Sequence, residues 1–201
     1  GIKTAEEADA VRKQLLAAAD INEKVQASWP AFLEKHYQNL SGMTKVYVCG
    51  VGANMGTACE GALKFGETIS IPSCAYEIEE YIHGPNIQMT PTYNVFLIDG
   101  GEGTKRIHQI YEGTQIVTSG VYLITNCADY QDEPNTFYVE CGLPEEITPL
   151  CYLPVFQMTA FRITEDLSRW LKHPLQRKME KSVSSKSENY ENSPFSEDTP
   201  G

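Results

Sequence analysis

The chain has 201 residues, 41% of them hydrophobic, and carries a formal net charge of −11. Those values suit one domain with a core of ordinary size and some extensions. The negative charge argues against nucleic acid and against an anionic membrane surface as partners, because both bind clustered Lys and Arg. No stretch approaches the roughly 18 apolar residues of a membrane span and no signal-peptide pattern is present, so we expect a cytoplasmic protein.

Helical spacing dominates the first 42 residues. Thr4 followed by Glu7 forms a capping-box signal for a helix start. Apolar residues recur at helical intervals from Val11 to Ala19, and "LSG" ends the pattern. Pro30 interrupts it, so we expect separate N-terminal helices.

Strand and helix patterns then alternate as far as residue 173. Apolar runs bounded by turn residues predict strands at 45–50, 93–101, 120–126 and 136–142. Helical periodicity predicts helices at 57–70, 103–120 and 147–173. Strands that are apolar throughout and alternate with helices are typical of a parallel sheet covered on both faces.

The six cysteines are scattered, and none forms a CxxC pair. Most lie in apolar runs such as "VYVCG", so we expect buried free thiols rather than disulfides. Scattered cysteines without an HxxxH pair also predict no metal site, and no cofactor is expected.

The turn "CGVGANMG" follows the first predicted strand and leads into a helix. Such a turn lets a ligand approach the backbone, and the helix N-terminus favours an anion. The same glycines are also compatible with nothing more than close packing. Gly50, Gly52 and Asn54 are candidate substrate-binding residues.

Glu60, Lys64 and Glu67 are spaced i, i+4, i+7 on the next helix and should share one face. The plain alternative is a solvated stripe with one ion pair, worth ~0.3–0.5 kcal/mol. Two features favour a site instead. The helix starts at the carboxyl end of the first strand, where ligands bind in open α/β sheets, and "EEYIHGP" brings in His83 before a rigid Gly-Pro pair.

These residue types suit sugar-phosphate isomerase chemistry. A carboxylate can take a proton from the carbon beside a carbonyl, if burial lifts its pKa toward neutral. An imidazole titrates near neutral pH and can pass a proton to a ring oxygen. A lysine can neutralise a phosphate or an enediolate oxygen.

The segments "GVGANMGTACEGALKFGE", "AYEIEEYIHGP" and "EKSV" resemble, in that order, the sugar isomerase (SIS) family. The resemblance is to the second SIS domain of two-domain enzymes, such as glutamine–fructose-6-phosphate aminotransferases and sugar–amino acid 6-phosphate deglycases. It runs from about Lys24 to Val183 and implies a three-layer flavodoxin-like α/β fold with a five-stranded parallel sheet.

The resemblance also implies residue roles. Glu67 would be the base for proton transfer between C1 and C2. His83 would assist ring opening and would be supplied across a dimer interface. Lys64 and Glu60 would support the open-chain sugar, and Lys181 would close over it.

One departure concerns the sugar phosphate. Family members hold it on a serine-rich loop of their first SIS domain, whereas the equivalent loop here reads "DGGEGTKR". Thr104 offers a hydroxyl, but Asp99 and Glu102 would repel a dianion unless Lys105 and Arg106 point inward. We therefore expect half of an active site, acting on a sugar phosphate as a homodimer or with a second SIS domain.

Four segments follow from these expectations: N-terminal helices at 1–40, an SIS domain at 41–172, an active-site strip at 173–185 and a flexible acidic tail at 186–201. Two functions stay open. One is a phosphosugar isomerase or deglycase half, and the other is a non-catalytic phosphosugar-binding module.

The remaining histidines and the tryptophans are expected to have no part in the chemistry. His36 and His108 should be solvated on helix faces. His173 should mark the end of the last helix, where a cation is mildly favoured. Trp29 and Trp170 should be core or interface residues.

Overall fold

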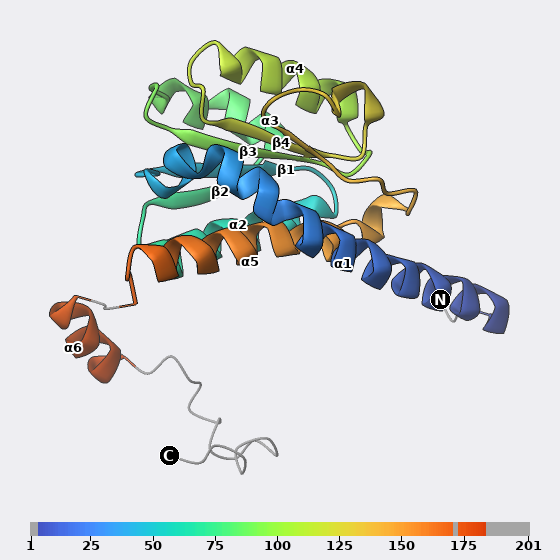
Figure 1. Cartoon of the computed structure of the whole chain (residues 1–201), viewed down its shortest axis with the longest axis horizontal. Coiled ribbons are helices and arrows are strands. Elements are labelled where there is room, and N and C mark those ends of the chain that lie inside the picture. Colours follow the sequence, from blue (N-terminus) through green and yellow to red (C-terminus); the bar gives the residue numbers. More distant parts are fainter. Residues whose placement is uncertain (1–3, 171–172, 184–201) are drawn as a thin grey trace.

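The computed structural model describes residues 4–170 and 173–183. Five parallel strands form one sheet in the order β2-β1-β3-β4-β5 between two layers of helices (Figure 1). The strands are β1 (Val46–Gly50), β2 (Ser73–Glu77), β3 (Asn94–Asp99), β4 (Val121–Thr125) and β5 (Thr136–Tyr138). The expected three-layer α/β fold with a five-stranded parallel sheet is confirmed.

Two separate cores lie on the two faces of the sheet. Helices α1 (Ala5–Ser41), α2 (Asn54–Lys64) and α5 (Pro149–Asp166) cover one face, and α3 (Ile78–His83) and α4 (Thr104–Gln115) cover the other (Figure 1). The three central strands are buried along their whole length. That burial on both faces explains their continuous apolar runs.

The sequence did not reveal β2. Its residues, "SCAYE", form no apolar run, and most of them are only half-buried. The strand lies at one edge of the sheet and pairs only with β1. An edge strand needs little apolar surface, so its pattern is weak.

The predicted break at Pro30 is wrong, because α1 runs unbroken through it. The missing N–H of a proline leaves the carbonyl four residues earlier without its helical partner. Both Pro30 and Gln26 are exposed, so water can take that place. The capping box is confirmed: the Thr4 hydroxyl accepts from the Glu7 amide at 3.2 Å, and the Glu7 carboxylate accepts from the Thr4 amide at 2.6 Å.

The long helix predicted at 147–173 is shorter than expected. Helix α5 ends at Asp166 instead of continuing to residue 173, and Ser168 then adopts a left-handed conformation with φ 52°. Helix α6 (Pro174–Ser182) follows, with the His173 ring accepting from the Leu175 amide. The tail predicted at 186–201 lies outside the described residues, and the four-segment division stays a prediction.

The cysteines agree only in part with the expectation. All six are free thiols, but only Cys49 and Cys151 are buried, while Cys59 and Cys74 are exposed. Over residues 4–170 and 173–183, no helix is long and apolar enough to cross a membrane. In the same ranges no group of three or more His, Cys, Asp or Glu side chains is placed to hold a metal ion.

Candidate functional site

The chain order of the strands creates a switch point between β1 and β3. From β1 the chain crosses to β2 on one side and then returns to β3 on the other. In open α/β sheets ligands bind in the crevice outside the carboxyl ends of such strands. Here the Gly50–Asn54 turn after β1 faces the Gly100–Gly103 loop after β3. Gly52 adopts φ 55°, a left-handed conformation that favours glycine.

Two carboxylates cover this glycine turn. A Cβ atom on Gly52 would clash with oxygens of both Glu102 and Glu145. Burial, and then the negative charge of Glu102, raise the pKa of Glu145 above its ordinary value. The crevice is therefore acidic, which agrees with the prediction that Glu102 would repel a phosphate dianion. Arg106 does not offset it, because its guanidinium forms a two-pronged ion pair with Glu79 of α3 at 2.6 and 2.9 Å.

Asn54, a predicted substrate contact, is fully buried. Its amide nitrogen donates to Thr148 Oγ1 at 2.8 Å, and its Oδ1 accepts from Thr57 Oγ1 at 3.2 Å. Gly50 and Gly100 fit closely around it, since a Cβ on either would clash with Asn54 atoms. In this form Asn54 ties the start of α2 to the start of α5, and its role toward a substrate remains a prediction.

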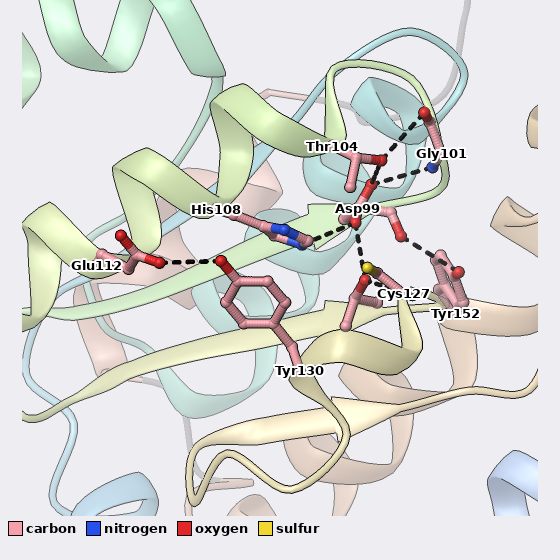
Figure 2. A network of polar contacts seen from close by, with 9 residues as sticks. Asp99, Gly101, Thr104, His108, Glu112, Cys127, Tyr130 and Tyr152 are labelled. Atoms are coloured by element: carbon pink, nitrogen blue, oxygen red, sulfur yellow. Dashed lines mark hydrogen bonds and ion pairs between the residues drawn. The ribbon is translucent and has the colours of Figure 1, made fainter.

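A buried carboxylate anchors the loop after β3 (Figure 2). Asp99 is 0% exposed. Its Oδ1 accepts from the Thr104 hydroxyl at 2.8 Å and from the Gly101 amide at 3.0 Å, and its Oδ2 accepts from the Thr125 hydroxyl at 2.7 Å. The Thr104 hydroxyl, predicted as a substrate contact, is thus engaged inside the protein, and that prediction also stays open.

The prediction that His108 is solvated is wrong. Its side chain is 8% exposed, and its Nε2 lies 3.0 Å from Asp99 Oδ2. The geometry of this contact falls short of a hydrogen bond, and Nε2 has no other hydrogen-bond partner in the described part of the chain. The Tyr130 ring covers the imidazole at 3.8 Å between centroids and donates its hydroxyl to Glu112 (Figure 2). The i, i+4 spacing of Thr104 and His108, on the helix that follows an aspartate at the end of a strand, was the sequence signal for this cluster.

The half-buried position of His36 was likewise missed. Its ring packs on Phe32 at 4.4 Å between centroids, and its Nε2 lies 3.0 Å from the Pro134 carbonyl oxygen. Desolvation is the main reason that its pKa is lowered. This histidine joins α1 to the segment before β5 and has no place in the crevice.

Replacing Asp99 with Asn should destabilise the fold by about 1–3 kcal/mol. The variant keeps the shape but loses the charge beside His108, and its amide donor would face the Thr125 hydroxyl proton. Urea unfolding measures the difference. The matched control is Asp129→Asn, since Asp129 is exposed and should change stability by no more than about 0.5 kcal/mol. Equal midpoints for the two variants would contradict this account.

The second predicted group forms an ion-paired stripe on the outside of α2. Lys64 Nζ lies 3.3 Å from Glu60 Oε1 and 2.8 Å from Glu67 Oε2. The hydrogen bond to Glu67 is the main reason that the pKa of Lys64 is raised. The three side chains do share one face, as their spacing predicted.

Glu67 occupies an unusual backbone position. It lies in a π-helical turn, Phe65–Ile69, that ends at Ser70 in a left-handed conformation with φ 61°. Phe65 and Ile69 are buried and fix the turn, while the Glu67 side chain remains 49% exposed. The turn follows α2 and ends the helical segment, a place where π-turns occur.

The stripe was expected at the carboxyl edge of the sheet, but it does not lie there. Only the start of α2 lies there, and the helix then runs back toward the amino ends of the strands. Ala62 accepts a hydrogen bond from the hydroxyl of Ser73, the first residue of β2, at 2.6 Å. Glu67 follows Ala62 and is therefore near the amino edge, away from the acidic crevice.

A single copy of the chain does not bring Glu67 and His83 together. His83 is the last residue of α3 and is exposed. Helix α3 packs through Tyr81 on one face of the sheet, whereas Phe65, beside Glu67, packs on the opposite face (Figure 1). Lys181 belongs to α6, and its side chain lies outside the described part of the chain.

Comparison with known proteins finds a sequence relative and many solved structures of similar fold. No family model matches the chain. It is 26% identical over 149 residues to the glutamine–fructose-6-phosphate aminotransferase (isomerizing) of Sulfurisphaera tokodaii. That alignment covers 74% of this chain but 25% of the enzyme, so the chain corresponds to about a quarter of that relative.

Three solved structures illustrate the fold. A Clostridium difficile protein described as a candidate phosphosugar isomerase has a TM-score of 0.82 at 20% identity, over 93% of this chain and 52% of its own. An Escherichia coli CFT073 protein in complex with A5P has a TM-score of 0.64 at 18% identity, over 83% of this chain and 95% of its own. The C-terminal domain of the Francisella tularensis glucosamine–fructose-6-phosphate aminotransferase has a TM-score of 0.62 at 16% identity, over 84% of this chain and 46% of its own. These likenesses establish the fold.

Proposed function

We propose that this chain, which has the SIS fold of phosphosugar isomerases, supplies one half of an active site for a ketose or fructosamine 6-phosphate. The reaction would open the sugar ring and transfer a proton between C1 and C2. The single observation that carries the proposal is the Glu60–Lys64–Glu67 stripe, with Glu67 exposed on a π-helical turn.

The proposed steps give each group a separate task. Glu67 takes the proton from one carbon and returns it to its neighbour. Lys64, held between two carboxylates, faces the negative charge that develops on the enediolate oxygen. His83 of a second copy passes a proton to the ring oxygen as the ring opens. In a deglycase acting on a fructosamine 6-phosphate, the same base would move a proton from C1 to C2 to give an imine at C1, and water would hydrolyse that imine to release the amino acid.

The phosphate would bind to another SIS domain. The switch-point crevice of this chain holds Glu102 and Glu145, and the nearby Arg106 is paired with Glu79. A phosphate dianion would meet like charge there. The C. difficile structure is about twice as long as the part it shares with this chain, which supports a second domain as the source of the phosphate site.

A phosphosugar-binding module without chemistry is the second candidate. The observation that favours it is the separation of Glu67 and His83 on opposite faces of one copy. The two candidates differ in whether they require a site shared between two copies, because only the enzyme needs Glu67 of one copy beside His83 of another.

Mixing two inactive variants should restore activity. In a twofold dimer, Glu67→Gln and His83→Ala subunits mixed one to one give half heterodimers, and each heterodimer keeps one intact site. Recovery of about a quarter of the wild-type rate is therefore expected, measured as deuterium uptake from solvent into fructose 6-phosphate by NMR. If a second SIS half proves necessary for turnover, it is added to every sample.

The matched control pairs Glu67→Gln with Lys64→Met. Both changes lie on the same stripe, so a heterodimer has one defect in each site and no recovery is expected. Equal recovery in both mixtures, or none in either with an active wild type, would overturn the shared site. A wild type that binds fructose 6-phosphate but shows no exchange would favour the binding module.

A further inference from the structure

An open polar hollow lies at the amino edge of the sheet, next to the π-helical turn that carries Glu67. Its volume is about 510 Å³, which is within the range of small-molecule sites. Three segments line it: the link from α1 to β1, the end of the π-helical turn with the link to β2, and the residues that follow α5. Ile69 of the turn is buried in its wall. The polar side chains of the hollow are those of Thr44, Ser70, Ser168 and Arg169.

Arg169 brings an available positive charge to this hollow. Its Nη1 donates to the carbonyl oxygen of Ile69, the last residue of the π-helical turn, at 3.0 Å. The edge formed by Nε and Nη2, which can bind a carboxylate with two parallel hydrogen bonds, has no partner in the described part of the chain. Arg12, Arg106 and Arg162 each pair with a carboxylate. In a chain with 27 Asp and Glu residues, an arginine without an ion pair among the described residues indicates an anion from outside.

Two serines in the wall of the hollow occupy backbone positions that favour glycine. Ser70 has φ 61° and Ser168 has φ 52°, and within residues 4–170 and 173–183 no other non-glycine residue has a positive φ. Ser168 follows α5 in a Schellman arrangement, in which its amide donates to the Glu165 carbonyl at 3.1 Å and the Arg169 amide donates to the Thr164 carbonyl at 2.9 Å. Glycine is the usual residue at such a position because it has no Cβ. Strained residues of this kind cluster at ligand sites, where a hydroxyl can compensate for the strain by binding.

We propose that the hollow binds the carboxylate of the amino acid in a fructosamine 6-phosphate, an inference that rests on the proposed function. In such a conjugate the amine is bonded to C1 of the sugar, so the carboxylate of an α-amino acid is three bonds from C1. Its receptor therefore has to lie near Glu67, the proposed base for C1 and C2, and Arg169 is hydrogen-bonded to the turn that carries Glu67. The Nε–Nη2 edge of Arg169 binds the two carboxylate oxygens, and the hydroxyls of Ser70 and Ser168 donate to them.

This carboxylate site would distinguish the two substrates of the proposed function. A ketose 6-phosphate has one anionic group, its phosphate, which a second SIS domain would bind. A fructosamine 6-phosphate has a second anionic group, the carboxylate of its amino acid. The hollow supplies a positive charge for that group, whereas the crevice with Glu102 and Glu145 would repel it. The hollow therefore favours the deglycase reaction over isomerisation of a simple ketose phosphate.

The test compares two conjugates of fructose 6-phosphate, one with glycine and one with glycinamide, by calorimetric titration of the full chain. Both conjugates carry the phosphate, and only the glycine conjugate carries the carboxylate. The glycine conjugate should bind at least about tenfold more tightly, because a hydrogen-bonded ion pair replaces a neutral contact. Arg169→Gln should abolish this preference and leave the affinity for the glycinamide conjugate unchanged. The matched control is Arg162→Gln, a change on α5 that breaks the pair with Asp166 and should keep the preference.

Two glycine variants separate binding from structure. Ser70→Gly and Ser168→Gly relieve a strained φ and should not lower the melting temperature, but each should reduce the preference for the glycine conjugate by about threefold. Equal binding of the two conjugates by the wild type, or a preference that survives Arg169→Gln, would overturn the carboxylate site and leave the proposed function standing. Binding of neither conjugate, with a second SIS half present, would overturn both.

Discussion

Replacing Glu67 with Gln should slow proton exchange on fructose 6-phosphate by at least about 100-fold. A positioned general base contributes about 10²–10⁴-fold to such a step, and an amide cannot accept the proton. Gln keeps the length of the side chain and its contact with Lys64, so the helix should be undisturbed. The rate is measured as deuterium uptake by NMR, and sugar-phosphate binding is followed by thermal shift.

Two further variants make this test specific. Glu23→Gln removes one exposed charge from α1 and should leave exchange unchanged. Glu60→Gln removes the other carboxylate at Lys64 and should slow exchange less than Glu67→Gln, because it does not touch the moving proton. A Glu67→Gln protein that exchanges at the wild-type rate would remove Glu67 as the base.

Replacing Trp29 with Ala should cost about 3–5 kcal/mol of stability. Trp29 is fully buried, packs at 4.9 Å on Phe32 and on Phe137, and donates its indole N–H to Thr159 Oγ1 at 2.9 Å. Truncation leaves a cavity of aromatic size and removes the indole donor from the Thr159 hydroxyl, which keeps its own hydrogen bond to the Val155 carbonyl at 2.6 Å. Urea unfolding at unchanged slope measures the loss.

Trp170 provides the matched control for this substitution. Its side chain is 53% exposed and contacts Phe161 at 6.3 Å between centroids. Trp170→Ala should therefore change stability by about 1 kcal/mol or less. A Trp29→Ala protein as stable as Trp170→Ala would mean that α1 contributes little to the core.

The sequence predicted those elements whose pattern is set by the chain near them. The central strands were visible because burial on both faces requires unbroken apolar runs, as in Val95–Ile98. The start of α1 was visible because a capping box involves only Thr4 and Glu7. The edge strand β2 was not, because its burial depends on a single neighbouring strand.

The candidate sites show the same limit more sharply. The stripe was predicted because Glu60, Lys64 and Glu67 are close in sequence and helix geometry fixes their common face. His108 was misplaced because its burial depends on Tyr130, which arrives from the segment after β4. Glu67 and His83 lie on opposite faces of the sheet because α2 and α3 pack on opposite faces. No local sequence pattern indicates which face α3 packs against.

The packing of α1 on α5 has a consequence for the order of folding during synthesis. Trp29 and its partner Thr159 are separated by 130 positions. At about 5–20 residues per second, the ribosome needs on the order of 10 s to make the intervening polypeptide. Throughout that interval Trp29 lacks its partner on α5. Nascent chains that end before Thr159 therefore expose this apolar side chain, which chaperones or other nascent chains can bind.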